Sequence, residues 1–111
     1  MRQETNLWLR QAREDLITAQ VNFKGDRFYA ASIFSQQAAE KALKALILER
    51  TGATPPRTHD LIALGHRVET PLEIMGALEQ LNPTYAVSRY PDVLTDTIPA
   101  DFIGKEAAKI I

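Results

Sequence analysis

One Ala-rich run, Phe28 to Arg50, constrains the fold more than any other part of the chain. At helical spacing, four polar side chains in its middle fall within one arc of roughly 100°, and we call them the polar stripe: Gln37, Glu40, Lys41 and Lys44. Apolar side chains cover most of the remaining surface: Phe34, Ala38, Ala39, Ala42, Leu43, Ala45, Leu46 and Ile47. The run therefore predicts a mostly buried helix that is the central member of a helical bundle.

Three uses of the polar stripe are open at this point. The stripe faces water, faces a second copy of the chain, or lines a binding site. Glu40 precedes Lys44 by four residues, which is the favourable orientation for an exposed ion pair on a helix. That spacing fits the first use without excluding the other two.

Length and composition predict one globular domain that spans residues 1–111. The chain has 111 residues, of which 45% are hydrophobic and 24% charged, both ordinary for a globular protein. No apolar stretch approaches the ~20 residues that span a bilayer, and the charged N-terminus has no apolar segment typical of a secretory signal. We therefore expect a cytoplasmic protein that does not enter membranes.

The charge and the residue types present limit the chemistry. With zero Cys there is no disulfide, thiolate nucleophile or Cys-ligated metal, and two His leave little for a zinc site, so we predict neither a metal nor a cofactor. The formal net charge is −1, so no global basic field attracts nucleic acid. RNA binding would have to be local, or created by dimerisation.

The first helix is expected from about Glu4 to Lys24, followed by a stop at Gly25-Asp26 and an antiparallel second helix. Its buried side is predicted at Leu9, Ala12, Leu16, Ala19 and Phe23, widened by Leu7 and Trp8, and its opposite face at Arg10, Arg13, Glu14 and Gln20. Asp15 is expected beside the buried side, partly exposed and near a basic partner.

The second helix runs to about Thr51, where Gly52 ends it, and a stiff connector with two prolines follows. We expect Thr58 or His59 to cap a third helix, with Asp60 in its first turn and an end between Gly65 and Val68.

Thr70, Pro71 and Glu73 form the pattern of a capping box, which predicts the start of a fourth helix that Asn82-Pro83 terminates. A loop is expected over residues 84–93, and a fifth helix from Pro99 to Ile111. That last helix ends without a cap or glycine, which is typical of a helix cut short by the end of the sequence. No strand pattern and no Gly-rich phosphate loop occur, so the predicted fold is all-α: an up-and-down bundle of about five helices.

Taken one at a time, the candidate functional residues are weak. His59 and Asp60 are adjacent, and adjacent helical residues do not face each other, so helix capping explains them better than a catalytic pair. His66 lies two helical turns after His59 and would share its face only on an unbroken helix. Arg89 has a guanidinium suited to phosphate and Tyr90 a ring suited to stacking on a base, although a packed loop with an Arg89–Asp92 pair explains them as well.

Taken together, the motifs are specific. Trp8, Asp15-Leu16 and Ala19 are followed in order by Tyr29-Ala30-Ala31, QQAAEKALKA from Gln36 to Ala45, THDL from Thr58 to Leu61, and SRYPD from Ser88 to Asp92. In this order, over nearly the whole chain, the sequence resembles the HEPN domains, small helical domains found in bacteria and archaea. The resemblance implies a helical bundle that usually forms a homodimer, binds nucleotides, and often partners a minimal nucleotidyltransferase in a toxin–antitoxin-like pair.

Many HEPN domains are metal-independent endoribonucleases that use an Arg, four to six intervening residues and a His. No Arg in this sequence stands at that spacing before His59 or His66. Our first interpretation is therefore a non-catalytic binding module, with a site formed by Gln37, Glu40, Lys41, Lys44, His59, Asp60, Arg89 and Tyr90. The alternatives are a ribonuclease with His59 as acid or base and Arg57 or Arg89 at the phosphate, and a purely structural dimer in which the polar stripe is an ion-paired seam.

Overall fold

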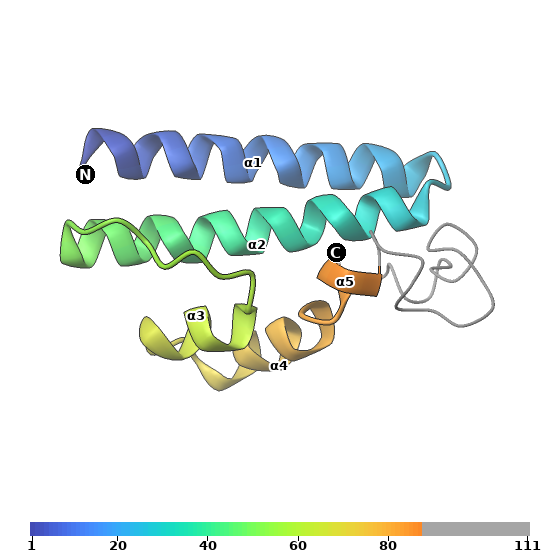
Figure 1. Ribbon diagram of the computed structural model, residues 1–111. Helices are drawn as coiled ribbons and strands as arrows, with labels where there is room; N and C mark the ends of the chain where they lie inside the picture. Colours follow the sequence, from blue (N-terminus) through green and yellow to red (C-terminus); the bar gives the residue numbers. More distant parts are fainter. Residues whose placement is uncertain (88–111) are drawn as a thin grey trace.

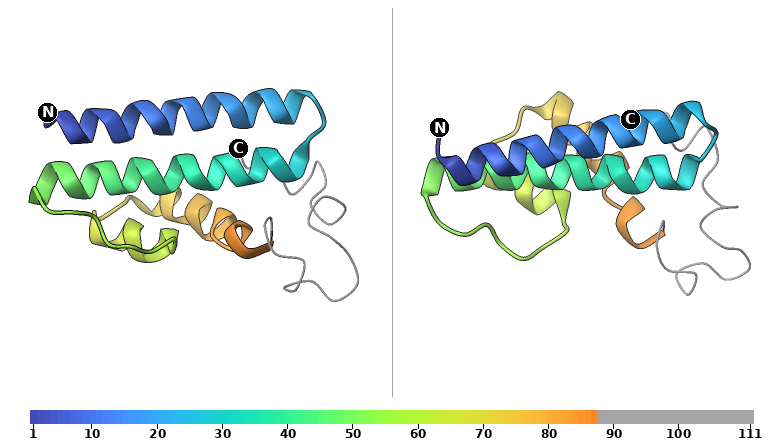
Figure 2. Two further views of the ribbon diagram at one scale, coloured as in Figure 1. Left: turned by 45° about the horizontal axis from the view of Figure 1, so that its top comes forward. Right: turned by 90° about the horizontal axis from the view of Figure 1, so that it is seen from above.

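The computed structural model describes residues 1–87, and these residues form helices and connecting turns without a strand. The helices are α1 (Gln3–Lys24), α2 (Phe28–Thr51), α3 (Leu61–Arg67), α4 (Leu72–Leu81) and the single turn α5 (Thr84–Val87). Figure 1 shows α1 antiparallel to α2 on one side and α3 to α5 on the other, and the views in Figure 2 agree. The predicted all-α class is confirmed, and α2 is the central helix.

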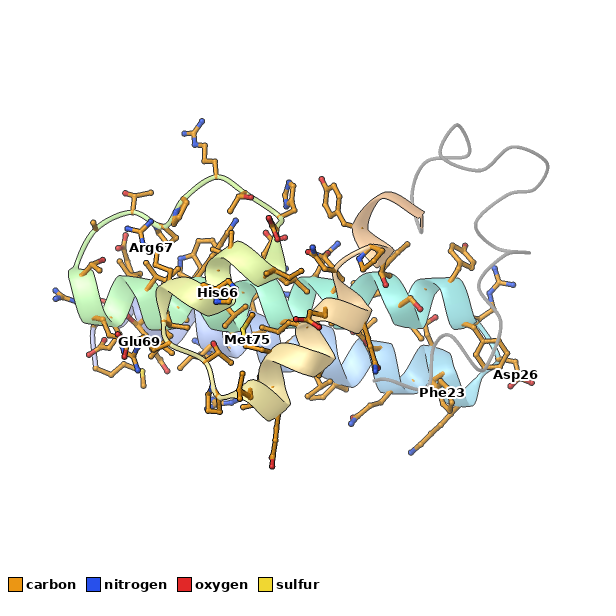
Figure 3. The ribbon with its side chains drawn as sticks, turned by 90° about the horizontal axis from the view of Figure 1, so that it is seen from below. Phe23, Asp26, His66, Arg67, Glu69 and Met75 are labelled. Carbon is orange, nitrogen blue, oxygen red and sulfur yellow. The ribbon has the colours of Figure 1, made fainter. Side chains whose placement is uncertain are left out.

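The turn between α1 and α2 lies where the sequence predicts it, but a different residue makes it. Gly25 has an ordinary negative φ of −88°, and Asp26 takes the left-handed conformation with φ 62°. Asp tolerates this region better than most residues because its side chain is short and polar. Phe23 and Phe28 meet edge-to-face across the turn, with ring centroids 5.6 Å apart, and Figure 3 shows Phe23 and Asp26 together at this end of the molecule.

Small side chains let α1 and α2 approach closely. The buried positions along the contact include Ala12, Ala19, Ala31, Ala38 and Ala45. Two predictions for α1 are wrong, because Leu7 is 51% exposed and Leu16 is 42% exposed. The buried side of α1 instead contains Thr5 and Asp15, which turns Leu7 away from α2.

The end of α2 and the start of α3 depend on two cap residues. Gly52 takes φ 70° and ends α2 as predicted. The N-terminal cap of α3 is Asp60, whose carboxylate accepts hydrogen bonds from the N–H groups of Ile62 and Ala63. The prediction of Thr58 or His59 as this cap is wrong, because the Thr58 hydroxyl oxygen accepts the N–H of Asp60 itself.

The predicted capping box of α4 does not form. Pro71 occupies the cap position without a side-chain cap, and the backbone N–H of Thr70 donates to the carbonyl of Gly65. Thr70 therefore belongs to the turn that joins α3 to α4. The helix ends before Asn82-Pro83 as predicted, but α5 occupies the start of the expected loop. The predicted helix over residues 99–111, and Arg89 and Tyr90, lie outside the described residues.

The core of this half of the molecule lies between α2, α3 and α4. It contains Ile47, Leu64 and Val68 in one cluster, and Leu61, Met75 and Leu78 in another. Gly65 permits the close approach of α4, because a Cβ there would lie 2.7 Å from the Met75 sulfur. Met75 and the neighbouring end of α3 are labelled in Figure 3. Among residues 1–87, no helix is long and apolar enough to cross a membrane.

Candidate functional site

Glu40, in the middle of α2, is the centre of a hydrogen-bond network. Its Oε1 accepts hydrogen bonds from the Nδ1 of His59 at 2.8 Å and from the Nε2 of Gln36 at 3.1 Å. Its Oε2 accepts a hydrogen bond from the Nζ of Lys44 at 3.0 Å. The side chains of Lys44 and Glu40 are only 9% and 12% exposed. The Glu40–Lys44 pair predicted from the spacing therefore forms, but it is not a solvated surface pair.

The environment of Glu40 favours its charged form. Burial by itself would raise the pKa of this carboxyl, but hydrogen bonds from His59, Lys44 and Gln36, together with the positive charge of Lys44, hold the pKa below its usual value. Glu40 is therefore ionised at neutral pH and only accepts hydrogen bonds. It follows that the Nδ1 of His59 has the proton in this contact.

A second ion pair connects α2 to α1. The Nζ of Lys41 donates to Asp15 at 2.5 Å and to the amide oxygen of Gln37 at 3.4 Å, and Gln11 donates to the other oxygen of Asp15 at 2.9 Å. The Asp15 side chain is 5% exposed and that of Lys41 is 25% exposed. The predicted basic partner of Asp15 is confirmed, whereas its predicted partial exposure is wrong.

His59 is joined to α5 by ring stacking. It lies on the connector before α3, half exposed, and its imidazole is parallel to the Tyr85 ring within 14°, with centroids 4.0 Å apart. Because Nδ1 is bonded to Glu40, the stack has a fixed orientation relative to the polar stripe. Tyr85 was expected only as part of a loop, and its place in the site was not predicted.

These residues surround one pocket of about 270 Å³, which we call the polar pocket. It is lined by Gln37, Glu40, Lys41, His59 and Tyr85. Three of the four polar-stripe residues therefore line a site, together with one predicted residue from the connector. Lys44 lies behind Glu40 and is buried against the bundle.

The other predicted residues within residues 1–87 do not line the polar pocket. Asp60 caps α3 and accepts a hydrogen bond from the Asn82 amide. Arg57 is exposed on the connector. Because α3 begins after His59, His59 and His66 share no helix face, and Figure 3 shows His66 on α3. Over residues 1–87, no three His, Asp or Glu side chains come close enough to hold a metal ion.

Sequence reasoning missed Tyr85 and Gln36. Gln36 is adjacent to Gln37 in the helix, and its own partner, Glu40, lies one helical turn ahead, so the i to i+4 spacing contained a usable signal. Nothing in the local pattern connected Tyr85 with His59, because the contact joins residues separated by two helices.

The sequence and the fold match one known family. The family model described as HEPN domain matches residues 5–111. The chain belongs to the HEPN domain family. A solved structure of TT1696 from Thermus thermophilus is similar to this HEPN chain with a TM-score of 0.87 and 29% identity, over 97% of this chain and 87% of that one.

A second HEPN relative extends the comparison. The structure of ST0689, described as an archaeal HEPN homologue, is similar with a TM-score of 0.78 and 32% identity, over 99% of this chain and 86% of that one. A comparison with curated proteins gives no match. The family and the fold are therefore shown, and the role of the polar pocket has to be argued from its own residues.

Proposed function

We propose that the polar pocket of this HEPN domain binds a nucleotide, with a phosphate at Lys41 and the base against the His59–Tyr85 stack. The observation that supports the proposal most strongly is the convergence of an ammonium group, two aromatic rings and an amide on one pocket of about 270 Å³. The ammonium group is suited to a phosphate, the rings are suited to stacking on a base, and the polar groups of the pocket are suited to a sugar hydroxyl.

Lys41 supplies the phosphate contact. An ammonium group has three N–H donors, and the contacts to Asp15 and Gln37 use two of them. The third N–H of Lys41 is available for a ligand oxygen in the polar pocket. The contacts with Asp15 and Gln37 hold the partly exposed ammonium group at the pocket. Asp15 holds this charge in place without entering the pocket itself.

The stacked rings supply the base contact. A nucleobase is a flat ring system that stacks on Tyr or His with little dependence on its sequence identity, at about 1–3 kcal/mol per base. The Nε2 of His59 has no hydrogen-bond partner among residues 1–87, since only Nδ1 is bonded. In the neutral ring it accepts a hydrogen bond, for example from a ribose hydroxyl, and in the protonated ring it donates one to a phosphate.

Pocket size and net charge favour a small ligand over a polymer. Pockets for drug-sized ligands start at roughly 300 Å³, and the polar pocket, at about 270 Å³, is close to that limit. The formal net charge of −1 provides no extended basic track for a long RNA. A mononucleotide fits both observations.

The test is isothermal titration with AMP, ATP, GTP and UMP. The phosphate contact is removed in the double variant Lys41→Ala/Asp15→Asn, which avoids leaving the buried Asp15 carboxylate without its positively charged partner. The stack is removed in Tyr85→Leu. Because a charge-assisted hydrogen bond contributes about 1.5–3 kcal/mol, we expect roughly 10- to 100-fold weaker binding in the double variant. Lys24→Ala, an exposed lysine at the end of α1, is the matched control and should bind as the parent does. Equal affinity in all four proteins, or no binding by the parent, would refute the proposal.

The partnership with a minimal nucleotidyltransferase, in a toxin–antitoxin-like pair, stays a prediction of the HEPN resemblance. It is tested separately by co-purification with a nucleotidyltransferase encoded beside it. Absence of a stable complex would remove this prediction without affecting the proposed nucleotide site.

A further inference from the structure

A second cavity, which we call the apolar groove, lies between α1, α2 and the end of α4. Figures 1 and 2 show α1 and α2 side by side, with α4 against α2. The apolar groove has a volume of about 360 Å³. Leu9 and Leu16 line it from α1, Leu81 lines it from the last residue of α4, and α2 contributes mainly alanines. The α2 positions in this lining are roughly 160° around the helix from the middle of the polar stripe. The apolar groove is therefore separate from the polar pocket.

Ser35 is the polar residue that α2 contributes to this lining. It is 5% exposed, and its hydroxyl has no hydrogen-bond partner among residues 1–87. Burial of a hydroxyl without a partner is unfavourable, and alanine, as at Ala38 and Ala42 in the same lining, would avoid it. A hydroxyl can donate one hydrogen bond and accept others. Ser35 therefore has the chemistry of a group that a bound ligand completes.

Arg13 brings a positive charge to the same groove. It lines the groove from α1 and is exposed. None of the three ion pairs within residues 1–87 includes Arg13, and no acidic side chain of these residues belongs to the lining. A guanidinium stays charged and offers two parallel N–H donors to a carboxylate. The groove thus combines an apolar surface with one cation and one buried hydroxyl.

We propose that the apolar groove binds a small amphiphilic carboxylate of the medium-chain fatty acid class. The alkyl chain contacts the leucines and alanines, and the carboxylate accepts hydrogen bonds from Arg13 and Ser35. The volume of about 360 Å³ falls in the range of roughly 300–1,000 Å³ found for small-molecule pockets. A plain hydrocarbon would leave the Ser35 hydroxyl unpaired, and a nucleotide would place its phosphate and sugar against leucines. A carboxylate on an alkyl chain satisfies both parts of the lining.

The first test is isothermal titration of the protein with butanoate, hexanoate and octanoate, below the concentrations at which they form micelles. Affinity should rise about two- to fourfold for each added CH₂ group, with one site per chain. Octyltrimethylammonium, with the same chain and the opposite charge, should bind at least about tenfold more weakly than octanoate. Equal binding of the two ligands, or no saturable binding of octanoate, would overturn the proposal. A groove filled by another protein segment would give the second of these results.

The second test assigns the contacts by substitution. Arg13→Gln should weaken octanoate binding about tenfold and leave the weaker binding of octanol unchanged. Arg10→Gln is the matched control, because Arg10 is exposed on the same helix and does not line the groove. Ser35→Ala should also weaken octanoate binding without lowering the melting temperature, because the hydroxyl it removes has no partner in the free protein. Octanoate binding that is unchanged in Arg13→Gln, or a lower melting temperature of Ser35→Ala, would overturn the assigned contacts.

The third test blocks the groove and separates it from the nucleotide site. Ala42→Leu, at a half-buried position of the lining, fills the groove and should abolish octanoate binding, with circular dichroism confirming that the variant is folded. Tyr85→Leu alters only the polar pocket and should bind octanoate as the parent does. Undiminished octanoate binding by folded Ala42→Leu, or its loss in Tyr85→Leu, would refute the apolar groove as the site.

Discussion

The buried pair of Glu40 and Lys44 should respond unequally to the loss of each partner. The Glu40 carboxylate has three hydrogen-bond donors, from His59, Gln36 and Lys44. Lys44, at 9% side-chain exposure, has Glu40 as its only hydrogen-bond partner within residues 1–87. Glu40→Ala therefore leaves a buried ammonium unpaired, whereas Lys44→Met leaves Glu40 with two hydrogen bonds.

The magnitudes follow from that difference. Removing one partner of a buried ion pair costs about 3–5 kcal/mol, and we expect the lower end, about 3 kcal/mol, for Glu40→Ala, because the lysine stem can extend towards solvent. Loss of one hydrogen bond to a charged group should make Lys44→Met cost about 1.5 kcal/mol. The double variant should cost no more than Glu40→Ala alone, because removing Lys44 also removes the unpaired charge. All four residues are acceptable in helices, so intrinsic helix propensity does not explain the order.

The assay is urea unfolding of the parent, the two single variants and the double variant at neutral pH, monitored by circular dichroism. Equal m-values would show that the differences in midpoint report stability of the same folded state. If Lys44→Met cost as much as Glu40→Ala, or if the two effects were additive, the network would not be centred on Glu40 and the reasoning would fail.

Three further predictions concern pH, helix packing and capping. Because the folded pKa of Glu40 is lowered from its usual 4.5, its contribution to stability is present above that value and is lost as pH falls through the folded pKa. The Glu40→Gln variant should therefore lose less stability than the parent when urea unfolding is repeated from neutral pH down to about pH 3. An identical loss in both proteins would contradict this. Gly65→Ala, whose Cβ would lie 2.7 Å from the Met75 sulfur, should lower the free energy of unfolding by about 1–2 kcal/mol. Gly76→Ala, with no neighbouring atom within 4 Å, should raise it by about 0.5–1 kcal/mol. Urea unfolding that gave changes of the same sign for both variants would refute the packing argument. Asp60→Ala should lower the melting temperature through loss of a cap contributing about 1 kcal/mol, and Asp60→Asn, which preserves the acceptor, should not; equal losses would exclude capping.

Helix boundaries were predictable where one residue decides the backbone conformation. Gly52 ended α2 as expected, because the left-handed conformation at that position favours glycine. The caps of α3 and α4 were not predictable, because several neighbouring side chains compete for the same N–H groups. At α3 the cap is Asp60, and the Thr58 hydroxyl oxygen instead accepts the N–H of Asp60. At α4 the side chain of Thr70 makes no cap, and its backbone N–H donates to the carbonyl of Gly65.

The site was predictable only along α2. Periodicity alone brought Gln37, Glu40 and Lys41 to one face, and these three residues do line the polar pocket. The stacking of Tyr85 on His59 depends on how α3, α4 and the intervening turns fold back onto α2, and a local pattern contains no information about that path.

The sequence by itself determined helices α1 to α4, the central place of α2 and the polar stripe, because the spacing of side chains on one helix is a local property. Tertiary structure decided which sides of those helices are covered. It turned Leu7 outward on α1, buried Asp15 against Lys41, and enclosed Lys44 behind Glu40. The physical reason is that burial depends on the neighbours that approach from elsewhere in the chain, so a polar residue becomes a solvated charge or a buried partner only once the helices have packed.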